Sequence, residues 1–445
     1  MKKNNKEQNH GYQLISQWMK ENGMTPFSFQ KKTWDYYARN YSGLVVAPTG
    51  FGKTYSVFLA VLMDYVNQPH MYFKGLKLLW ITPLRSLSKD LTLAMQRTLD
   101  NMGIDWKVGL RNGDISQSEK QRQNYRMPDV LVITPESLHL MMAQKSKSSF
   151  FAHLKCVVVD EWHELLGTKR GVLTELALVH LKSISSNIKI WGLTATIGNL
   201  EQALEVLIPH NDKRILVKAK EKKKILIKSL LPEKPETLPW AGHMGSAMVQ
   251  KILPVIKKSK STLLFTNTRN QAETWYRNLL EADPDLAGLI AIHHSSIDTG
   301  LRNWIEDHLA SGYLKVVVCT SSLDLGVDFK PVDTVIQIGS PKGVARFFQR
   351  AGRSGHSPHE TSKLYFVPTH TLELVEAAAI KQAYARYAVE SREPFVLAFD
   401  VLVQFLVTLA VGEGFYPEKI KKQILSTFAF RHMSEDEWQW ALLFI

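Results

Sequence analysis

The stretch Ala47-Pro48-Thr49-Gly50-Phe51-Gly52-Lys53-Thr54 lies between an apolar run at residues 44–46 and a helix-forming segment at residues 55–65. A loop between a strand and a helix can direct its backbone N–H groups and the positive end of the helix dipole at an anion. Lys53 supplies a positive charge for nucleotide phosphates, and the Thr54 hydroxyl is of the type that ligates magnesium in such loops. The stretch predicts a phosphate-binding loop at the end of a buried strand.

The residue types of this loop also fit a close approach of the backbone to the phosphates. Gly50 and Gly52 lack the side chain that would hold a ligand away. We expect Thr49, directly before Gly50, to contact the nucleotide with them. Ala47 stands where the strict pattern has glycine, but the strand and helix on either side are those that the pattern requires. We therefore predict that ATP binds here with Mg2+.

A second motif, Asp160-Glu161-Trp162-His163, follows the apolar run at residues 156–159. A carboxylate at the carboxyl end of a strand beside a phosphate loop can hold magnesium, and a neighbouring carboxylate can polarise the attacking water. We assign these roles to Asp160 and Glu161. Taken alone, the motif is better explained as an acidic strand end, and the phosphate loop upstream is what favours catalysis. Thr194-Ala195-Thr196 follows another strand, and its hydroxyls are expected to bond to His163 or Asp160.

A third motif, Gln349-Arg350-Ala351-Gly352-Arg353-Ser354-Gly355-His356, lies in the second half of the chain. Arg353 and Arg350 are candidates for an arginine finger, which stabilises the charge that develops on a transferred phosphoryl group. The alternative is a solvated basic helix end, although the two glycines favour close backbone packing. Arginines so far from the phosphate loop are expected on a different domain, with ATP in a cleft between two domains. That is the layout of a motor.

Short β-branched runs alternate with longer amphipathic segments along most of the chain, which predicts parallel sheets covered by helices. We divide the chain into an α/β domain at residues 1–210, a linker leading into a strand at 211–245, a second α/β domain at 246–390 and a helical segment at 391–445. The second domain contains no Gly-Lys-Thr of its own. The two α/β domains are therefore predicted to be structural relatives, of which only the first binds phosphate.

The helical segment contains an expected helix at residues 399–411, another at 417–428 and a third that opens with the capping box Ser434-Glu435-Asp436-Glu437. Three short helices can form a winged-helix or helix-turn-helix core, and a generic bundle is equally consistent. The chain stops in the apolar stretch 440–445. We therefore expect it to be a piece of a longer protein.

The net charge of +13 favours a polyanionic partner, most simply nucleic acid, over a generally basic surface. Residues 1–10 are polar, and the longest apolar stretch, 401–411, is shorter than the roughly 20 residues that cross a bilayer. Cys156 and Cys319 lie in or beside apolar runs without the spacing of metal ligands. We predict a cytoplasmic protein without membrane association.

The ordered set of motifs resembles that of the superfamily 2 helicases over nearly the whole chain. Phe27-Ser28-Phe29-Gln30 resembles the Q motif, in which Gln30 would read the adenine edge. Further stretches resemble motifs Ia, Ib, III, IV and V in order: Pro83-Leu84-Arg85-Ser86-Leu87, Thr134-Pro135-Glu136, Thr194-Ala195-Thr196, Leu264-Phe265-Thr266-Asn267-Thr268-Arg269 and Thr320-Ser321-Ser322-Leu323-Asp324-Leu325-Gly326-Val327-Asp328.

The box Asp160-Glu161-Trp162-His163, continuing to Gly171, is similar to the Lhr-type helicases, especially their bacterial ligase-associated branch, as is His293-His294-Ser295-Ser296. His356 stands where generic members have arginine, which leaves Arg353 as the preferred finger. The resemblance implies two tandem RecA-like domains followed by a winged helix, with His163 and Gln349 in the catalytic set. It implies ATP-dependent 3′-to-5′ translocation on single-stranded DNA, unwinding of duplexes or DNA–RNA hybrids, and a role in DNA repair. DNA ligase and nuclease-type repair partners and a monomeric state are further expectations.

Motifs Ia, Ib, IV and V face the nucleic-acid strand in this family. The strand-contact candidates are Arg85, Arg111, Thr134, Arg269 and Thr320. For a single arginine, an ordinary surface position is the alternative. An RNA helicase, a nucleic-acid-binding module without catalysis and a nuclease-linked translocase are the competing functions. The joint presence of Lys53, Glu161 and Arg353 disfavours the second, and no convincing nuclease motif supports the third.

Overall fold

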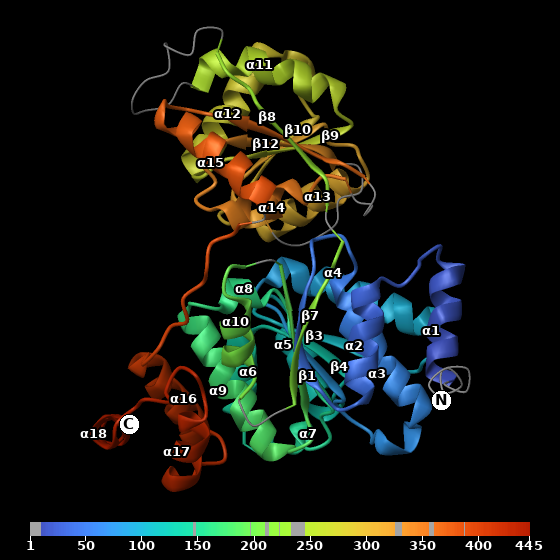
Figure 1. The fold of residues 1–445 in the computed structure, drawn as a ribbon, viewed down its shortest axis with the longest axis vertical. Helices are drawn as coiled ribbons and strands as arrows, with labels where there is room; N and C mark the ends of the chain where they lie inside the picture. Colours follow the sequence, from blue (N-terminus) through green and yellow to red (C-terminus); the bar gives the residue numbers. More distant parts are fainter. Residues whose placement is uncertain are drawn as a thin grey trace. The chain divides into compact units, whose positions relative to one another are not determined.

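The computed structural model describes residues 10–145, 148–195, 197–209, 213–221, 223–232, 245–324, 332–355, 360–386 and 388–445 (Figure 1). Contacts between residues divide the chain into two compact units. Unit 1 comprises Met1–Ala47, Gly52–Lys220 and Ser391–Ile445, and unit 2 comprises Pro48–Phe51 and Glu221–Glu390. Each unit is built around its own parallel sheet, which confirms the predicted fold class.

The sheet of unit 1 has the strand order β3-β4-β2-β5-β6-β1-β7, and its neighbouring strands are parallel. Its central strands are apolar and buried, as strands covered by helices on both faces must be. The strands are β1 (Ser42–Val46), β2 (Leu78–Ile81), β3 (Val108–Arg111), β4 (Val130–Ile133), β5 (Cys156–Val159), β6 (Lys189–Thr194) and β7 (Arg214–Lys218). The edge strands β3 and β7 are mostly half-buried, and the apolar residues of β7 lie between Arg214 and Lys218.

Helices pack on both faces of this sheet (Figure 1). In α3, nine residues including Lys53 are buried, because the helix follows the phosphate loop into the core. The helices of the α/β part of unit 1 are α1 (His10–Glu21), α2 (Ser28–Ala38), α3 (Lys53–Asn67), η1 (Pro69–Met71), α4 (Arg85–Asn101), α5 (Gln117–Tyr125), α6 (Pro135–Met142), α7 (Ser148–Phe151), α8 (Trp162–Leu165), α9 (Lys169–Ile184) and α10 (Leu200–Leu207).

The sheet of unit 2 has the order β10-β11-β9-β12-β13-β8, again with parallel neighbours. Five of its strands lie within the predicted second α/β domain, residues 246–390. They are β9 (Ser261–Phe265), β10 (Ile290–His293), β11 (Val316–Cys319), β12 (Val332–Ile338) and β13 (Ser362–Val367), with β8 (Ile225–Ser229) added at one edge. The accompanying helices are α11 (Gly245–Lys258), α12 (Arg269–Ala282), η3 (Pro284–Leu286), α13 (Thr299–Ala310), η4 (Ser321–Leu323), α14 (Val344–Ala351) and α15 (Leu372–Arg386).

The segment expected as a linker, residues 211–245, contributes to both sheets. Its described part places β7 beside β1 in the first sheet and β8 beside β13 in the second. The alternating charged and apolar residues of this stretch resemble a solvated run in sequence. They form edge strands because each sheet has an unpaired neighbouring strand to receive them.

The C-terminal residues form α16 (Phe399–Val411), α17 (Pro417–Leu425) and α18 (Glu435–Phe444). Ser434 and Glu437 make the predicted capping box of α18. The three helices belong to unit 1, where their apolar faces join one buried core with the helices under the sheet. The Phe405 ring lies 5.8 Å from His139 and 6.1 Å from His180, on α6 and α9.

Cys156 and Cys319 lie buried within β5 and β11, where the apolar pattern placed them. In the part of the chain that the structure describes, no helix combines the length and apolarity needed to cross a bilayer.

Candidate nucleotide and nucleic-acid site

The order of the strands in unit 1 brings the first two motifs together. β5, β6 and β1 are neighbours, with Val159 opposite Gly192 and Val46 opposite Thr194. Because all three strands are parallel, the residues that follow them emerge at the same edge of the sheet. The phosphate loop follows β1, and Asp160 follows β5. This is the edge at which open α/β sheets bind their ligands.

The phosphate loop turns through two glycines in the left-handed region. Gly50 has φ 83° and Gly52 has φ 68°, conformations that disfavour residues with a Cβ. A Cβ on Gly52 would also lie 3.0 Å from Nε2 of Gln30. Helix α3 begins directly after it, so the N-terminal N–H groups of that helix lie at the loop, as an anion site requires.

Gln30 fastens this loop to the segment before α2. Its Nε2 donates to the Gly52 carbonyl at 2.9 Å, and its Oε1 accepts from the Phe27 backbone N–H at 2.8 Å. The side chain is buried. Both ends of the amide therefore bond within the protein, and Gln30 couples the predicted adenine-reading segment to the phosphate loop.

Lys53 and Glu161 form a buried ion pair at the centre of this edge. Lys53 Nζ lies 3.3 Å from Glu161 Oε2, and both side chains are nearly inaccessible. Glu161 has φ 45°, so the turn after β5 directs this carboxylate back toward the loop. The pair joins the first residue of α3 to the residue after Asp160, as the sequence predicted for a common site.

Asp160 lies beside this pair in a buried position. Its Oδ2 accepts from Trp80 Nε1 at 3.2 Å, and its Oδ1 accepts from the Glu161 backbone N–H at 2.9 Å. Burial and the nearby Glu161 carboxylate raise the pKa of Asp160. A divalent cation would offset both effects, and carboxylate and hydroxyl oxygens, here of Asp160 and Thr54, are the ligands that magnesium prefers. The donor set fits Mg2+.

His163 connects the second motif to the strand beside it. Its Nδ1 lies 3.2 Å from Thr194 Oγ1, 3.4 Å from the Ala195 backbone nitrogen and 3.5 Å from Glu161 Oε2. The predicted bond from the hydroxyl at 194 to His163 is confirmed, while Thr196 lies outside the described residues. Burial lowers the pKa of His163, which favours a neutral ring that accepts hydrogen bonds at Nδ1.

In unit 2, Arg350 is held by partners within that unit. Its Nε donates to Asp324 Oδ1 at 2.6 Å, and its Nη1 donates to Gln337 Oε1 at 2.6 Å. The guanidinium also lies over the Phe265 ring at 4.7 Å. The expectation that Arg350 faces ATP is not supported by this arrangement, because its charge is used to bind the third motif to Asp324 of motif V.

Arg353 and Gln349 are also buried, with 4% and 7% of their surfaces exposed. Gln349 lies within α14, and Arg353 follows the end of that helix, where its backbone N–H donates to the Arg350 carbonyl at 2.9 Å. Gly355 has φ 68° at the turn that follows. His356, which distinguishes the motif in sequence, lies outside the described residues.

The five predicted strand contacts fall into two groups. Arg85 and Arg269 are exposed, and they bond to Asp114 at 2.8 Å and to Ser295 at 2.9 Å, respectively. Arg111, Thr134 and Thr320 are buried.

The buried members have local structural contacts. Arg111 donates to Asn124 at 3.4 Å, and burial lowers the pKa of its guanidinium. Thr134 caps α6 by accepting from the Ser137 backbone N–H, and Thr320 is the residue before η4. Contact with nucleic acid therefore stays a prediction for Arg85 and Arg269, which lie on the surface. The side chains of Arg111, Thr134 and Thr320 are buried instead, so a direct contact with a strand is not supported for them.

Arg170 was not among the predicted site residues, although it connects two of the motifs. Its guanidinium pairs with Glu136 of motif Ib, with Nη2 3.1 Å from Oε2, and Nη2 also donates to the Pro83 carbonyl of motif Ia at 2.9 Å. Arg170 lies in the sequence that extends the second motif toward Gly171. This position was the only feature of the sequence that could have identified Arg170 as a site residue, because its partners are distant in sequence.

Comparison with known families assigns most of the chain. Residues 27–203 match the DEAD/DEAH box helicase family, residues 245–357 match the helicase conserved C-terminal domain, and residues 382–445 match the winged helix domain of the large helicase-related proteins.

Similar proteins carry the same assignment. An ATP-dependent helicase Lhr-Core of Sulfolobus acidocaldarius is 31% identical over 95% of this chain and 50% of its own length. The Lhr helicase/uracil glycosylase of Escherichia coli is 29% identical over 87% of this chain and 29% of its own length. The chain thus spans about half, or less, of the length of these relatives.

Among solved structures, the Mycobacterium smegmatis helicase Lhr bound to ssDNA and AMP-PNP has a TM-score of 0.86 and 27% identity. The match covers 96% of this chain and 57% of that one. The two-sheet fold, the order of the motifs and the winged-helix match agree. The chain therefore belongs to the Lhr-type DEAD/DEAH box helicases.

Proposed function

We propose that this chain is the motor portion of an ATP-dependent helicase that moves 3′-to-5′ on single-stranded DNA. The observation that carries the proposal is the buried pair of Lys53 and Glu161, with Asp160 beside it, at one edge of the sheet, where β1 and β5 flank β6. A phosphate-binding cation and a water-activating carboxylate are the two groups that nucleotide hydrolysis needs at close quarters.

In this proposal Lys53 exchanges Glu161 for the β- and γ-phosphates when ATP binds. Glu161 is then released to orient and polarise the attacking water. Thr54 and Asp160 would hold magnesium, which supplies charge neutralisation on the phosphates. The N–H groups of the loop, with Thr49, Gly50 and Gly52, would bind the phosphate oxygens. Gln30 keeps the loop in place through its bond to Gly52.

We assign the arginine finger to Arg353, with Gln349 as its neighbour in the catalytic set. The support is the motif in sequence together with the contacts of Arg350, whose guanidinium bonds to Asp324 and Gln337. Arg350 then acts as a positioning residue that holds the end of α14. His163 transmits the state of Glu161 to Thr194 and Ala195.

DNA is the proposed track because the similar M. smegmatis helicase Lhr is described as bound to ssDNA. Arg85 and Arg269 are the proposed contacts to its phosphates, which bind without regard to sequence. A role in DNA repair, DNA ligase and nuclease partners, a monomeric state, cytoplasmic location and the ligase-associated branch rest on the sequence resemblance alone. An RNA helicase remains the second candidate.

The deciding experiment is steady-state ATP hydrolysis with magnesium, alone and with single-stranded DNA or RNA of equal length, with Lys53→Ala as the blank. We expect DNA to stimulate turnover more than RNA does. Greater stimulation by RNA would support the second candidate. If the folded protein binds nucleic acid but does not hydrolyse ATP under any of these conditions, the motor function is contradicted. The remaining candidate is then a nucleic-acid-binding module without catalysis.

Polarity needs its own measurement. Displacement of a labelled strand from duplexes with a 3′ or a 5′ single-stranded tail should be faster with the 3′ tail. Equal or opposite rates would contradict 3′-to-5′ movement without affecting the ATPase assignment.

A further inference from the structure

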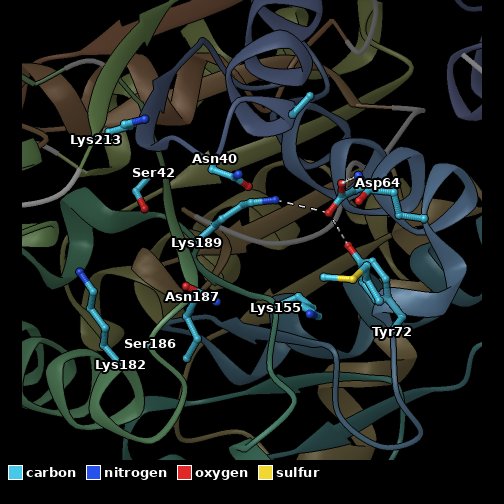
Figure 2. Close-up of a pocket in the computed structure, with 14 residues that line it drawn as sticks. Asn40, Ser42, Asp64, Tyr72, Lys155, Lys182, Ser186, Asn187, Lys189 and Lys213 are labelled. Carbon is cyan, nitrogen blue, oxygen red and sulfur yellow. Dashed lines mark hydrogen bonds and ion pairs between the residues drawn. The ribbon is translucent and has the colours of Figure 1, made fainter.

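Charged side chains at a pocket in unit 1, where β6 and β1 begin, bond to one another within the protein (Figure 2). Figure 2 shows Asp64 between Tyr72, whose hydroxyl donates to Asp64 Oδ2 at 2.8 Å, and Lys189, whose Nζ lies 3.3 Å from the same oxygen. Lys189 also lies over the Tyr37 ring at 4.0 Å. These contacts belong to the packing of unit 1. In unit 2, charged side chains instead hold a helix that carries the third motif.

Helix α14 (Figure 1) carries Gln349 and Arg350 and ends just before Arg353. Its N-cap position is Gly343, and within the described residues 343–351 no side chain caps the helix. Glu390 supplies the missing acceptor, because both of its carboxylate oxygens accept from the Ala345 backbone N–H, at 3.2 and 3.1 Å. A carboxylate is favoured at this end, since the N-terminus of a helix carries roughly +0.5 charge.

Gly343 leaves the space that the Glu390 carboxylate occupies. The glycine has φ 140°, and a Cβ at this position would lie 2.5 Å from Glu390 Oε1. A residue with a Cβ would therefore displace the carboxylate from the end of the helix.

Lys223 holds the other end of α14. Its Nζ donates to the backbone carbonyls of Gly352 and Gly355, at 3.4 and 2.6 Å, and these two residues lie on either side of Arg353 in the sequence. The lysine is buried. The C-terminus of a helix carries roughly −0.5 charge, so a cation at this end is stabilising. The two ends of α14 are thus held by side chains of opposite charge.

Both side chains lie near the places where the chain passes between the units. The longer part of unit 2 is Glu221–Glu390, so Lys223 lies close to its start and Glu390 is its last residue. Two residues after Glu390, the backbone of Arg392 is bonded to the Asn199 side chain of unit 1, through its N–H and its carbonyl, each at 2.8 Å. A single residue therefore separates the contact with α14 in unit 2 from the next contact in unit 1.

Ordinary helix capping is the simpler explanation, and a neighbouring helix shows what it looks like. In α13 the cap is Asp298, which directly precedes the helix and accepts from the N–H groups of Gly300 and Leu301. Helix α14 is held instead by side chains 45 and 129 positions away from their partners. Capping alone requires no such distant residues, whereas a link between the chain connections and α14 does.

We propose that Glu390 and Lys223 are positioning residues that hold α14, and with it Arg353, in place relative to the two chain connections. The inference rests on the proposed function, in which Arg353 is the arginine finger. Because the Glu390 carboxylate bonds directly to the backbone of α14, a movement of the segment that follows Glu390 acts on the helix that carries the motif.

Steady-state ATP hydrolysis with magnesium tests this role. Glu390→Ala and Lys223→Met should each lower kcat by about tenfold and leave KM for ATP within about twofold, because a group used in the transition state is misplaced. Glu390→Gln keeps an acceptor without the charge and should give an intermediate rate. Asp298→Ala removes the cap of α13 and should keep kcat within about twofold. An equal loss in Asp298→Ala, or wild-type kcat in the Glu390 variants, would overturn the proposal.

Amide hydrogen exchange gives a result that does not depend on ATP turnover. Exchange should become about fivefold faster at residues 344–351 in Glu390→Ala and at residues 352–355 in Lys223→Met, while Asp298→Ala should affect α13 instead. Unchanged exchange at residues 344–355 in both variants would overturn the proposal. If the wild type hydrolyses no more ATP than Lys53→Ala, the proposed function fails, and the exchange result still decides whether Glu390 and Lys223 hold α14.

Discussion

Arg170 and Glu136 form a two-pronged ion pair, and the same guanidinium donates to the carbonyl of Pro83 at 2.9 Å. Pro83 precedes α4 and Glu136 lies in the first turn of α6, so one side chain fixes the spacing of motifs Ia and Ib. Arg170 is itself in the first turn of α9, close in sequence to Asp160-Glu161, the proposed catalytic residues. We infer that it is a positioning residue between the proposed nucleotide site and the motifs proposed to contact the strand.

We expect Arg170→Ala to reduce DNA-stimulated ATP hydrolysis by about fivefold, because the partly exposed ion pair and the bond to the Pro83 carbonyl are together worth on the order of 1 kcal/mol. Basal hydrolysis should stay within about twofold, since Arg170 does not contact Lys53 or Glu161 in the described structure. Arg122→Ala removes an exposed arginine paired with Glu119 and serves as the control. Equal loss of basal and stimulated rates would show that Arg170 supports only the fold.

Glu161→Gln should keep ATP affinity within a few-fold but slow hydrolysis by at least about 10²-fold, because the amide cannot activate water. The variant also loses the ion pair to Lys53, whose charge then remains available to phosphate. Binding of a fluorescent ATP analogue and single-turnover hydrolysis separate the two effects. Glu281→Gln, on the exposed face of α12, is the matched control. Near-normal turnover would remove Glu161 from its proposed role.

Substitution of the two arginines of the third motif should have different effects: loss of Arg350 should lower stability, and loss of Arg353 should lower hydrolysis. Arg350→Ala leaves Asp324 buried without its main partner, so unit 2 should lose about 3–5 kcal/mol of unfolding free energy. Arg350→Ala/Asp324→Asn should recover part of that loss, as measured by urea unfolding. Arg353→Ala should retain more stability and ATP affinity while losing hydrolysis. A loss of ATP affinity as large as the loss of hydrolysis would instead make Arg353 a ground-state contact.

The buried carboxyl of Glu175 should make the packing of the C-terminal helices against α9 less stable as the pH rises. Burial raises the pKa of this α9 carboxyl to about 8, although the backbone N–H of Ala429 donates to it at 3.2 Å. The unfolded value is about 4.3, so the folded state favours the protonated form. The resulting stability is present in full below about pH 4 and is lost as pH rises through about 8.

Thermal unfolding between pH 5 and pH 9 should therefore show a larger decline for the wild type than for Glu175→Gln. Glu201→Gln, an exposed change on α10, should follow the wild type. Parallel declines in all three proteins would show that Glu175 does not titrate in this range.

Asn199 holds the backbone that leads into α16. Its side chain accepts from the Arg392 N–H at 2.8 Å and donates to the Arg392 carbonyl at 2.8 Å. At the next residue, the Glu393 carbonyl lies 2.5 Å from where a Cβ on Gly167 would sit. Asn199→Ala and Gly167→Ala should each speed amide hydrogen exchange in residues 391–398. Asn22→Ala, which removes a hydrogen bond at the end of the N-terminal helix, is the control. Unchanged exchange at residues 391–398 in Asn199→Ala and Gly167→Ala would show that these two residues do not hold the segment in place.

The sequence by itself determined the fold class, the order of the motifs and most central strands. It could do so because buried parallel strands are short apolar runs, and because the phosphate loop and Asp160-Glu161 are local patterns. The edge strand β3 was missed since half-buried positions accept mixed residues, and β7 was missed because its short apolar run lies in a basic stretch that was expected to be a linker. The sequence also identified Lys53, Glu161 and His163 as candidate site residues, but it could not show how far apart they lie in the structure.

Tertiary structure alone decided which of those residues share a partner. Parallel pairing of β5, β6 and β1 brought Lys53 to Glu161 and Thr194 to His163. Packing within unit 2 paired Arg350 with Asp324. Packing within unit 1 buried Arg111 and made Arg170 the connection between two motifs. Each of these contacts joins residues separated by long stretches of chain, and local sequence carries no record of which long-range partner a charged side chain will meet.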